Sequence, residues 1–73
     1  MKNTKNKSRI ILSNNMRKFR TLLGITQEEL SYRSGLHRTY ISSVERTERN
    51  ISVDAIEKIA KAFNISISKL LEE

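Results

Sequence analysis

The amino-acid sequence predicts an all-α fold, a compact domain of five helices. The chain of 73 residues contains no proline and only two glycines, so few residues interrupt a helix. Apolar residues recur three or four positions apart along most of the chain, which is the spacing of one face of an α-helix. Residues 65–68 alternate as a strand would, but this segment is too short to form a sheet by itself.

The first two helices are predicted over residues 9–23 and 27–34. The apolar stripe of the first helix repeats at intervals of four, three and four residues and consists of Leu12, Met16, Phe19 and Leu23. Gly24 follows at the position where a helix often ends in a left-handed residue. Thr26 and Glu29 have the spacing of a capping box, which marks the start of the second helix. A serine–glycine pair then ends that helix.

Three further helices are predicted over residues 37–46, 53–63 and 66–72. Two apolar residues three positions apart mark the inner side of the first of these helices. Serines at the starts of the other two can accept hydrogen bonds from free backbone N–H groups. Residues 1–8 have no apolar side chain after the first methionine, so a flexible basic arm is predicted there and the folded domain over 9–73. This arm either follows DNA or acts as a solubilising tail.

Composition excludes several classes of protein. Cysteine is absent, which excludes disulfides and thiolate metal sites. The longest apolar run, residues 10–12, is far shorter than the roughly 20 residues that span a bilayer, and no secretion signal is present, so no membrane contact and a cytoplasmic location are predicted. No phosphate loop, nucleophile elbow or carboxylate pair is present, and the single histidine has no metal-binding companion. We therefore expect no enzyme activity, cofactor or metal.

Charge favours a polyanionic partner for the first two thirds of the chain. The formal net charge is +6. Residues 1–50 carry 11 basic and 4 acidic side chains, whereas residues 51–73 carry 3 basic and 4 acidic ones. A basic segment 1–50 and a nearly neutral segment 51–73 indicate that the first segment carries a nucleic-acid-binding surface and the second has another role.

The segment 27–46 has the pattern of a helix-turn-helix. Its apolar positions, which would hold two short helices against the core, are Leu30, Leu36, Ile41 and Val44. Ser31 and Ser34 are small where the two helices would cross, and Gly35 permits the positive φ of a sharp turn. In this motif the second helix enters the major groove of double-stranded DNA.

Polar residues on the outer side of the second helix are the candidate contacts to DNA. An arginine there can pair with guanine and a threonine methyl can touch thymine. The predicted base contacts are Arg38, Thr39, Ser42, Ser43 and Arg46. The predicted phosphate contacts include His37, Tyr40, Arg49 and Asn50. Tyr40 is equally suited to packing, and His37 is expected to cap the helix.

Three stretches of the chain resemble the phage-repressor/Cro-type (XRE) helix-turn-helix family: MRKFRTLLGITQEEL, SGLHRTYISSVERTERNIS and IEKIAKAFNISISKLL. Together the resemblance covers about residues 10–71. The stretch LHRTYISSVERTERNIS is most similar to the controller proteins of restriction–modification systems. Ser31 and Ser34 depart mildly from the family, which often has alanine there. The resemblance implies a repressor-like DNA-binding domain and a dimeric transcriptional regulator acting on a pseudo-palindromic operator.

The resemblance also assigns roles to individual residues. It implies that Gln27 is a phosphate contact, and the start of a helix favours an anion there. It implies an internal ion pair between Arg20 and Glu45. It further implies that Glu28 or Glu29 could contact RNA polymerase, so that one dimer activates and a neighbouring one represses.

The end of the chain is predicted to form a homodimer. Its apolar side chains cover an arc too wide for one side of a short helix, and the predicted interface consists of Ile65, Ile67, Leu70 and Leu71. Plain core packing is the alternative. For the whole protein, a phage-type repressor or an antitoxin stays open, as does a protein-interaction module that binds no DNA.

Overall fold

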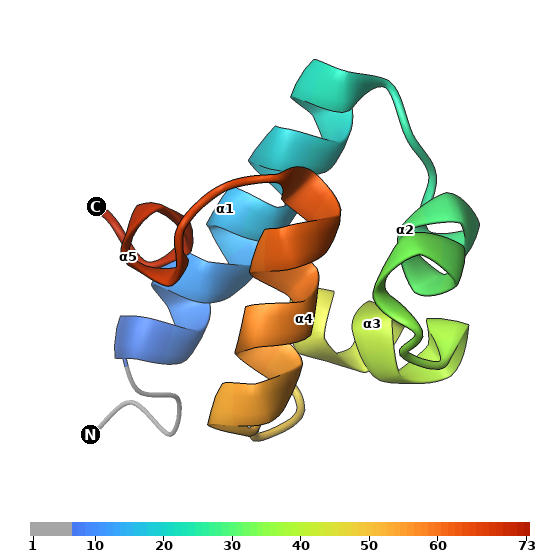
Figure 1. Ribbon diagram of the computed structural model, residues 1–73. Coiled ribbons are helices and arrows are strands. Elements are labelled where there is room, and N and C mark those ends of the chain that lie inside the picture. Colours follow the sequence, from blue (N-terminus) through green and yellow to red (C-terminus); the bar gives the residue numbers. More distant parts are fainter. Residues whose placement is uncertain (1–6) are drawn as a thin grey trace.

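The computed structural model describes residues 7–73 and is helical throughout its regular structure (Figure 1). The predicted all-α class is confirmed, because this part of the chain forms five helices and no strand. The helices are α1 (Lys7–Leu23), α2 (Gln27–Ser34), α3 (Arg38–Glu45), α4 (Val53–Phe63) and α5 (Ile67–Leu70).

Three helices differ in length from their predicted ranges. α3 spans Arg38–Glu45 where 37–46 was predicted, because His37 and Arg46 are its capping residues. α1 begins at Lys7, so Lys7 and Ser8 are helical and the predicted arm can extend only to residue 6. Residues 1–6 lie outside the described part of the chain. α5 has four residues and ends at Leu70, and the backbone N–H of Leu71 closes its last turn by bonding to the carbonyls of Ile67 and Ser68.

Side chains and left-handed residues set the helix ends at the positions that the sequence indicates. The hydroxyls of Thr26, Ser52 and Ser66 each accept a hydrogen bond from the backbone N–H three residues later, at 3.0 to 3.1 Å. Gly24 has φ +69° and ends α1 as predicted, and Asn64 has φ +60° after α4. Local chemistry therefore determines most of the element boundaries.

The arrangement of the helices places α2 and α3 at one side of the molecule (Figure 1). α1 and α4 lie in the middle, and α5 packs against both of them on the opposite side. α3 contacts α1 and α2, and α2 also contacts α4. The fold thus supports the α2–α3 pair from behind and leaves its outer side to solvent.

The core lies between these helices. Its fully buried large side chains come from every helix: Leu12, Met16, Leu30, Ile41, Ile59 and Leu70. The rings of Phe19 and Phe63 extend the core, with centroids 5.7 Å apart. Leu23 departs from the predicted stripe, since it is 50% exposed where the last turn of α1 extends beyond the neighbouring helices.

Candidate nucleic-acid interface

A tight turn joins α2 to α3 and sets the direction of α3. Gly35 has φ +77°, and its N–H donates to the Ser31 carbonyl at 2.9 Å. The Ser31 hydroxyl donates to the Leu36 carbonyl at 2.6 Å across the same turn. His37 then caps α3, as predicted, because its Nδ1 accepts from the Thr39 N–H at 3.1 Å.

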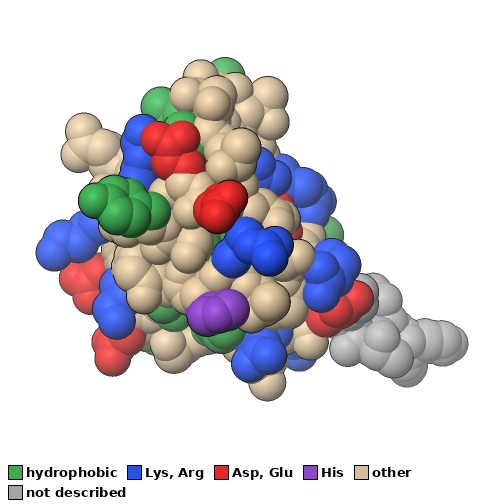
Figure 2. Space-filling model, turned by 90° about the vertical axis from the view of Figure 1, so that its right-hand side faces the viewer, with side chains coloured by type: hydrophobic (Ala, Val, Ile, Leu, Met, Phe, Trp, Pro, Cys, Tyr) green, Lys and Arg blue, Asp and Glu red, His purple; other side chains and the backbone are tan. Residues whose placement is uncertain are grey.

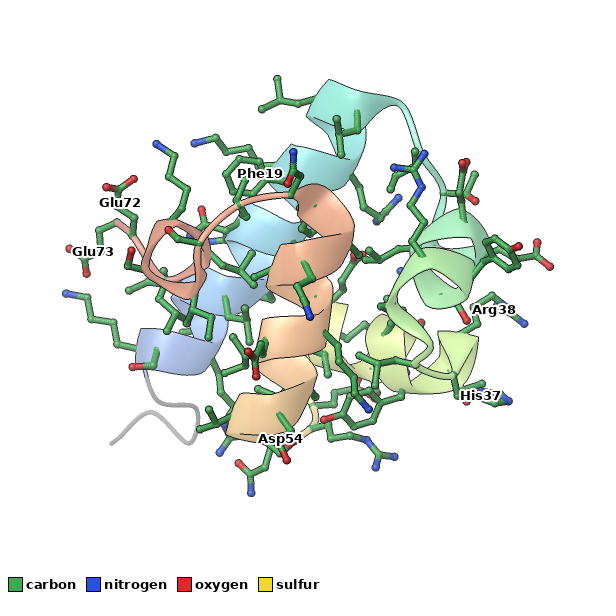
Figure 3. All side chains as sticks on the ribbon, in the orientation of Figure 1. Phe19, His37, Arg38, Asp54, Glu72 and Glu73 are labelled. Carbon is green, nitrogen blue, oxygen red and sulfur yellow. The ribbon has the colours of Figure 1, made fainter. Side chains whose placement is uncertain are left out.

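α3 has one buried side and one exposed side. Ile41, Val44 and Glu45 are buried against the rest of the protein. Arg38 and Thr39 are exposed at the start of the helix. Figure 3 shows His37 and Arg38 projecting from the outer edge of the molecule, away from α1 and α4. The helix therefore presents a polar surface on a rigid support.

The five predicted base-contact residues differ in how their polar atoms are used. Arg38 makes no hydrogen bond or ion pair within residues 7–73, so its guanidinium is available. The Thr39 hydroxyl lies 2.6 Å from His37 Nδ1. Ser42 accepts a hydrogen bond from Arg46 Nη1. Ser43 is already engaged on both sides, since its hydroxyl donates to the Tyr40 carbonyl at 2.8 Å and accepts from Arg49 Nε at 3.1 Å.

The predicted phosphate-contact residues also differ in the contacts that they make within the protein. Arg49 lies against α3, with its guanidinium carbon 5.2 Å from the centre of the Tyr40 ring. Asn50 is exposed and, together with Arg9 and Leu71, lines a groove of about 230 Å³. The side-chain amide of Gln27 turns inward, and one of its N–H groups donates to Glu45 Oε1 at 2.9 Å. The second N–H of this amide and the backbone N–H in the first turn of α2 remain for an anion.

A buried ion pair anchors the end of α3. Arg20 Nε and Nη2 donate to the two carboxylate oxygens of Glu45 at 2.8 and 2.9 Å, which confirms the pair that the family resemblance implies. The hydrogen bond to Glu45 raises the pKa of Arg20, and the opposite charge adds to this while burial acts against it. Arg17, which also lies in α1, donates to the backbone carbonyl of Glu45. α3 is therefore fastened to α1 by charge as well as by apolar packing.

Two residues after α3 have roles that no sequence pattern predicts. Thr47 has φ +62°, a conformation that β-branched residues rarely adopt. Its hydroxyl lies 3.2 Å from that of Ser13 in α1. Glu48 forms an ion pair with Arg46, with 3.1 Å between Glu48 Oε1 and Arg46 Nε. The signal for this pair is only two opposite charges two positions apart, and nothing in the sequence marks Thr47, since no glycine stands there.

The exposed surface around α2 and α3 carries mixed charge (Figure 2). Several Lys and Arg side chains surround the single histidine in this view, and Asp and Glu side chains lie among them. Such a surface can attract a phosphate backbone without being uniformly positive.

At the other end of the molecule, the predicted dimer interface needs one correction. Leu70 is completely buried within its own chain, because α5 packs its side chain between α1 and α4, and it has no surface left for a partner. Ile65 and Ile67 are partly buried against the same core, and Leu71 is 37% exposed. Asn15 Nδ2 donates to the carbonyls of Leu70 and Glu72, which holds α5 on α1.

Within residues 7–73, none of the helices has the length and apolar character that crossing a membrane requires. The same residues bring no three His, Asp or Glu side chains together in a way that could hold a metal ion.

Two short helices, joined by a glycine turn and with the second exposed along one polar face, define the helix-turn-helix class of DNA-binding folds. The family model described as helix-turn-helix matches residues 16–70. The chain belongs to this family, and the resemblance predicted from sequence is confirmed.

Comparison with individual proteins shows which members of this family the chain is similar to. The chain is 51% identical to the control protein C.SmaI of Serratia marcescens over 84% of this chain and 73% of that protein. It is similar to the crystal structure of the restriction–modification controller C.AhdI from Aeromonas hydrophila, with 37% identity and a TM-score of 0.84 over 89% of this chain and 98% of that one. It is equally similar, at 36% identity and a TM-score of 0.84, to the controller C.Esp1396I, whose structure is a tetramer in complex with its natural 35 base-pair operator; the match covers 90% of this chain and 87% of that one.

Proposed function

We propose that this protein is a sequence-specific transcriptional regulator that binds operator DNA as a homodimer and controls a restriction–modification system. The observation that carries this proposal is the outer face of α3, where exposed polar residues stand on a helix fixed by buried Ile41, Val44 and Glu45. A controller of similar fold has been crystallised as a tetramer on its operator. The proposed place of action is the cytoplasm.

In this proposal, Arg38 and Thr39 read base edges from the first turn of α3. The Arg38 guanidinium has no partner in the described chain, so a bidentate contact to guanine O6 and N7 breaks no existing bond. Thr39 offers its methyl group, since its hydroxyl is held by His37. Ser42 and Arg46 extend the reading surface toward the end of the helix. Ser43 is less able to contact a base, because its hydroxyl already donates one hydrogen bond and accepts another.

The phosphate contacts would position this helix without selecting a sequence. His37, Tyr40 and Arg49 border the outer face of α3, and Asn50 follows in the loop. For Gln27 we propose a contact through its backbone N–H together with the second N–H of its amide, because the first is bound to Glu45.

The homodimer would form at the end of the molecule opposite α3. Leu71 is the most exposed of the apolar residues there, and Ile65 and Ile67 are partly exposed beside it. A two-fold axis through this end would present two copies of α3 to successive major grooves, about 34 Å apart, on a pseudo-palindromic site.

Contact with RNA polymerase would use the exposed acidic side of α2. Glu29 forms an ion pair with Arg33 at 3.0 Å, so Glu28 is the carboxylate better placed to meet a basic partner. A titration of promoter output against protein should rise and then fall if one dimer activates and a second one represses. A monotonic titration would remove the activating role and leave a simple repressor.

Selection of bound duplexes from a random pool tests the main proposal. We expect a recovered palindrome whose half-sites are separated by about one helical turn, 10 base pairs. A gel shift that gives no complex with any duplex at modest salt would instead support a protein-interaction module. A complex that forms only with a second protein bound would support an antitoxin.

A further inference from the structure

One acidic side chain lies within the surface that α3 and the following loop present to solvent. Glu48 accepts a hydrogen bond from Arg46 Nε at 3.1 Å. Arg46 Nη1 donates in the other direction, to the Ser42 hydroxyl one turn back along α3. The guanidinium is thus held along the outer face of the helix, between Ser42 and a carboxylate.

The backbone fixes the position of Glu48. Its N–H donates to the Ser43 carbonyl and the Thr47 N–H donates to the Val44 carbonyl, both at 2.9 Å, which is the Schellman pattern of a helix end. Thr47 takes the left-handed position that glycine usually fills, and its hydroxyl contacts Ser13 in α1. A strained residue persists only where its surroundings hold it. The chain therefore holds Glu48 beside Arg46 by a defined turn.

We propose that Glu48 is a specificity-determining residue of the DNA-binding surface, because it holds Arg46 in one orientation and offsets its charge until a base edge replaces the carboxylate. This inference rests on the function proposed above. Random DNA offers mainly phosphates, and the carboxylate of Glu48 both offsets the charge of Arg46 toward them and repels them itself. An operator offers acceptors on a base edge, and a guanidinium already oriented loses less side-chain entropy on binding them.

The variant Glu48→Gln tests the charge, since glutamine keeps the size and an acceptor oxygen for Arg46. At about 0.1 M salt, we expect affinity for random duplex to rise about three- to tenfold. The slope of log K against log salt should become steeper by about 0.9. Operator affinity should change less than about twofold, because added charge and looser orientation of Arg46 oppose each other. Fluorescence anisotropy with the selected operator and a scrambled duplex of equal length measures both affinities.

Glu48→Ala removes the acceptor as well as the charge. We expect the ratio of operator to random affinity to fall further than in Glu48→Gln, this time through weaker operator binding. An Ala variant that binds operator as tightly as the Gln variant would contradict the orienting part of the proposal.

Glu72→Gln is the matched control. Glu72 pairs with Lys69 at 3.4 Å, and the exposed fractions of this pair (54% and 66%) resemble those of Arg46 and Glu48 (56% and 54%). Glu72 lies across the molecule from His37 and Arg38 (Figure 3). The control changes net charge by the same amount as Glu48→Gln but at a site far from α3. It should therefore leave the ratio of operator to random affinity near that of the unaltered protein. Sedimentation should confirm an unchanged oligomeric state.

Three outcomes overturn the inference. Equal effects of Glu48→Gln and Glu72→Gln would show that net charge alone acts. A selective loss of operator binding in Glu48→Gln would make Glu48 a direct reader of a base, such as the cytosine amino group. If the unaltered protein binds operator and scrambled duplex equally, the proposed function itself fails and the role of Glu48 fails with it.

Discussion

Glu45 and Arg46 are consecutive residues at the end of α3, and each belongs to an arginine–glutamate pair. Glu45 faces inward, where it meets Arg20 with exposed fractions of only 3% and 20%. Arg46 faces outward and meets Glu48, with more than half of each side chain exposed. The same pairing of charges therefore occurs on opposite sides of one short helix, in two different surroundings.

The two pairs differ in how well solvent can replace the glutamate when it is removed. If Glu45 is removed, Arg20 loses its carboxylate in a place that water reaches poorly, and the free energy of unfolding falls. If Glu48 is removed, water and salt ions solvate Arg46 almost as well. The inner pair can thus hold the fold, whereas the outer pair can be exchanged for another partner such as DNA.

The largest effect expected concerns the inner pair. Glu45→Gln should lower the free energy of unfolding by about 3 kcal/mol, because Arg20 keeps its charge and loses the carboxylate. Urea unfolding followed by circular dichroism measures this change. A double variant with apolar residues at both positions, Arg20→Met and Glu45→Leu, should recover much of the loss. If Glu45→Gln costs less than about 1 kcal/mol, the inner pair is no more than a surface pair in energetic terms.

The second effect concerns binding. Arg38→Ala should weaken operator binding by about 2 kcal/mol and relax the base preference at one position of each half-site, because a bidentate contact is lost. Its stability should stay near that of the unaltered protein, since Arg38 has no partner within the described chain. Anisotropy titrations with operator and with a set of single-base variants measure both properties. A uniform loss on all duplexes would make Arg38 a phosphate contact.

Much of the fold could be predicted from the sequence, because the signals that fix it are local. Thr26, Ser52 and Ser66 cap helices that begin within one residue of them, and Gly35 adopts the left-handed turn. The helical spacing of apolar residues then gives the buried face. The outward position of Arg38 follows from the same periodicity, so this part of the candidate site was predictable too.

The remaining features depend on contacts between distant residues. The inward turn of the Gln27 side chain requires Glu45, 18 positions away, to lie beside it. The left-handed Thr47 depends on the end of α3 and on Ser13 in α1, and no local signal replaces them. The apolar pattern of a four-residue helix likewise cannot tell whether Leu70 faces its own core or a partner chain.

The third effect extends the comparison to the C-terminal end. Leu71→Ala should weaken the proposed dimer by about 1 kcal/mol per protomer, because Leu71 retains exposed apolar surface that a partner would cover. Leu22→Ala is the control, since Leu22 is more exposed, at 69%, near the far end of α1. Sedimentation equilibrium over a range of concentrations measures the dissociation constant. Equal dissociation constants for both variants would place the two-fold contact elsewhere.

The smallest effect completes the comparison of the two ion pairs. Glu48→Gln should change the free energy of unfolding by no more than about 0.5 kcal/mol, because Arg46 regains water as the pair is broken. The same urea titration used for Glu45→Gln gives this value, with Glu72→Gln as a second exposed pair. A cost close to that of Glu45→Gln would mean that Glu48 holds the turn at Thr47 in place, and its effect on DNA binding would then come from a misplaced loop. A small cost together with a lowered operator preference would separate the two roles, with Glu45 stabilising α3 and Glu48 tuning what α3 binds.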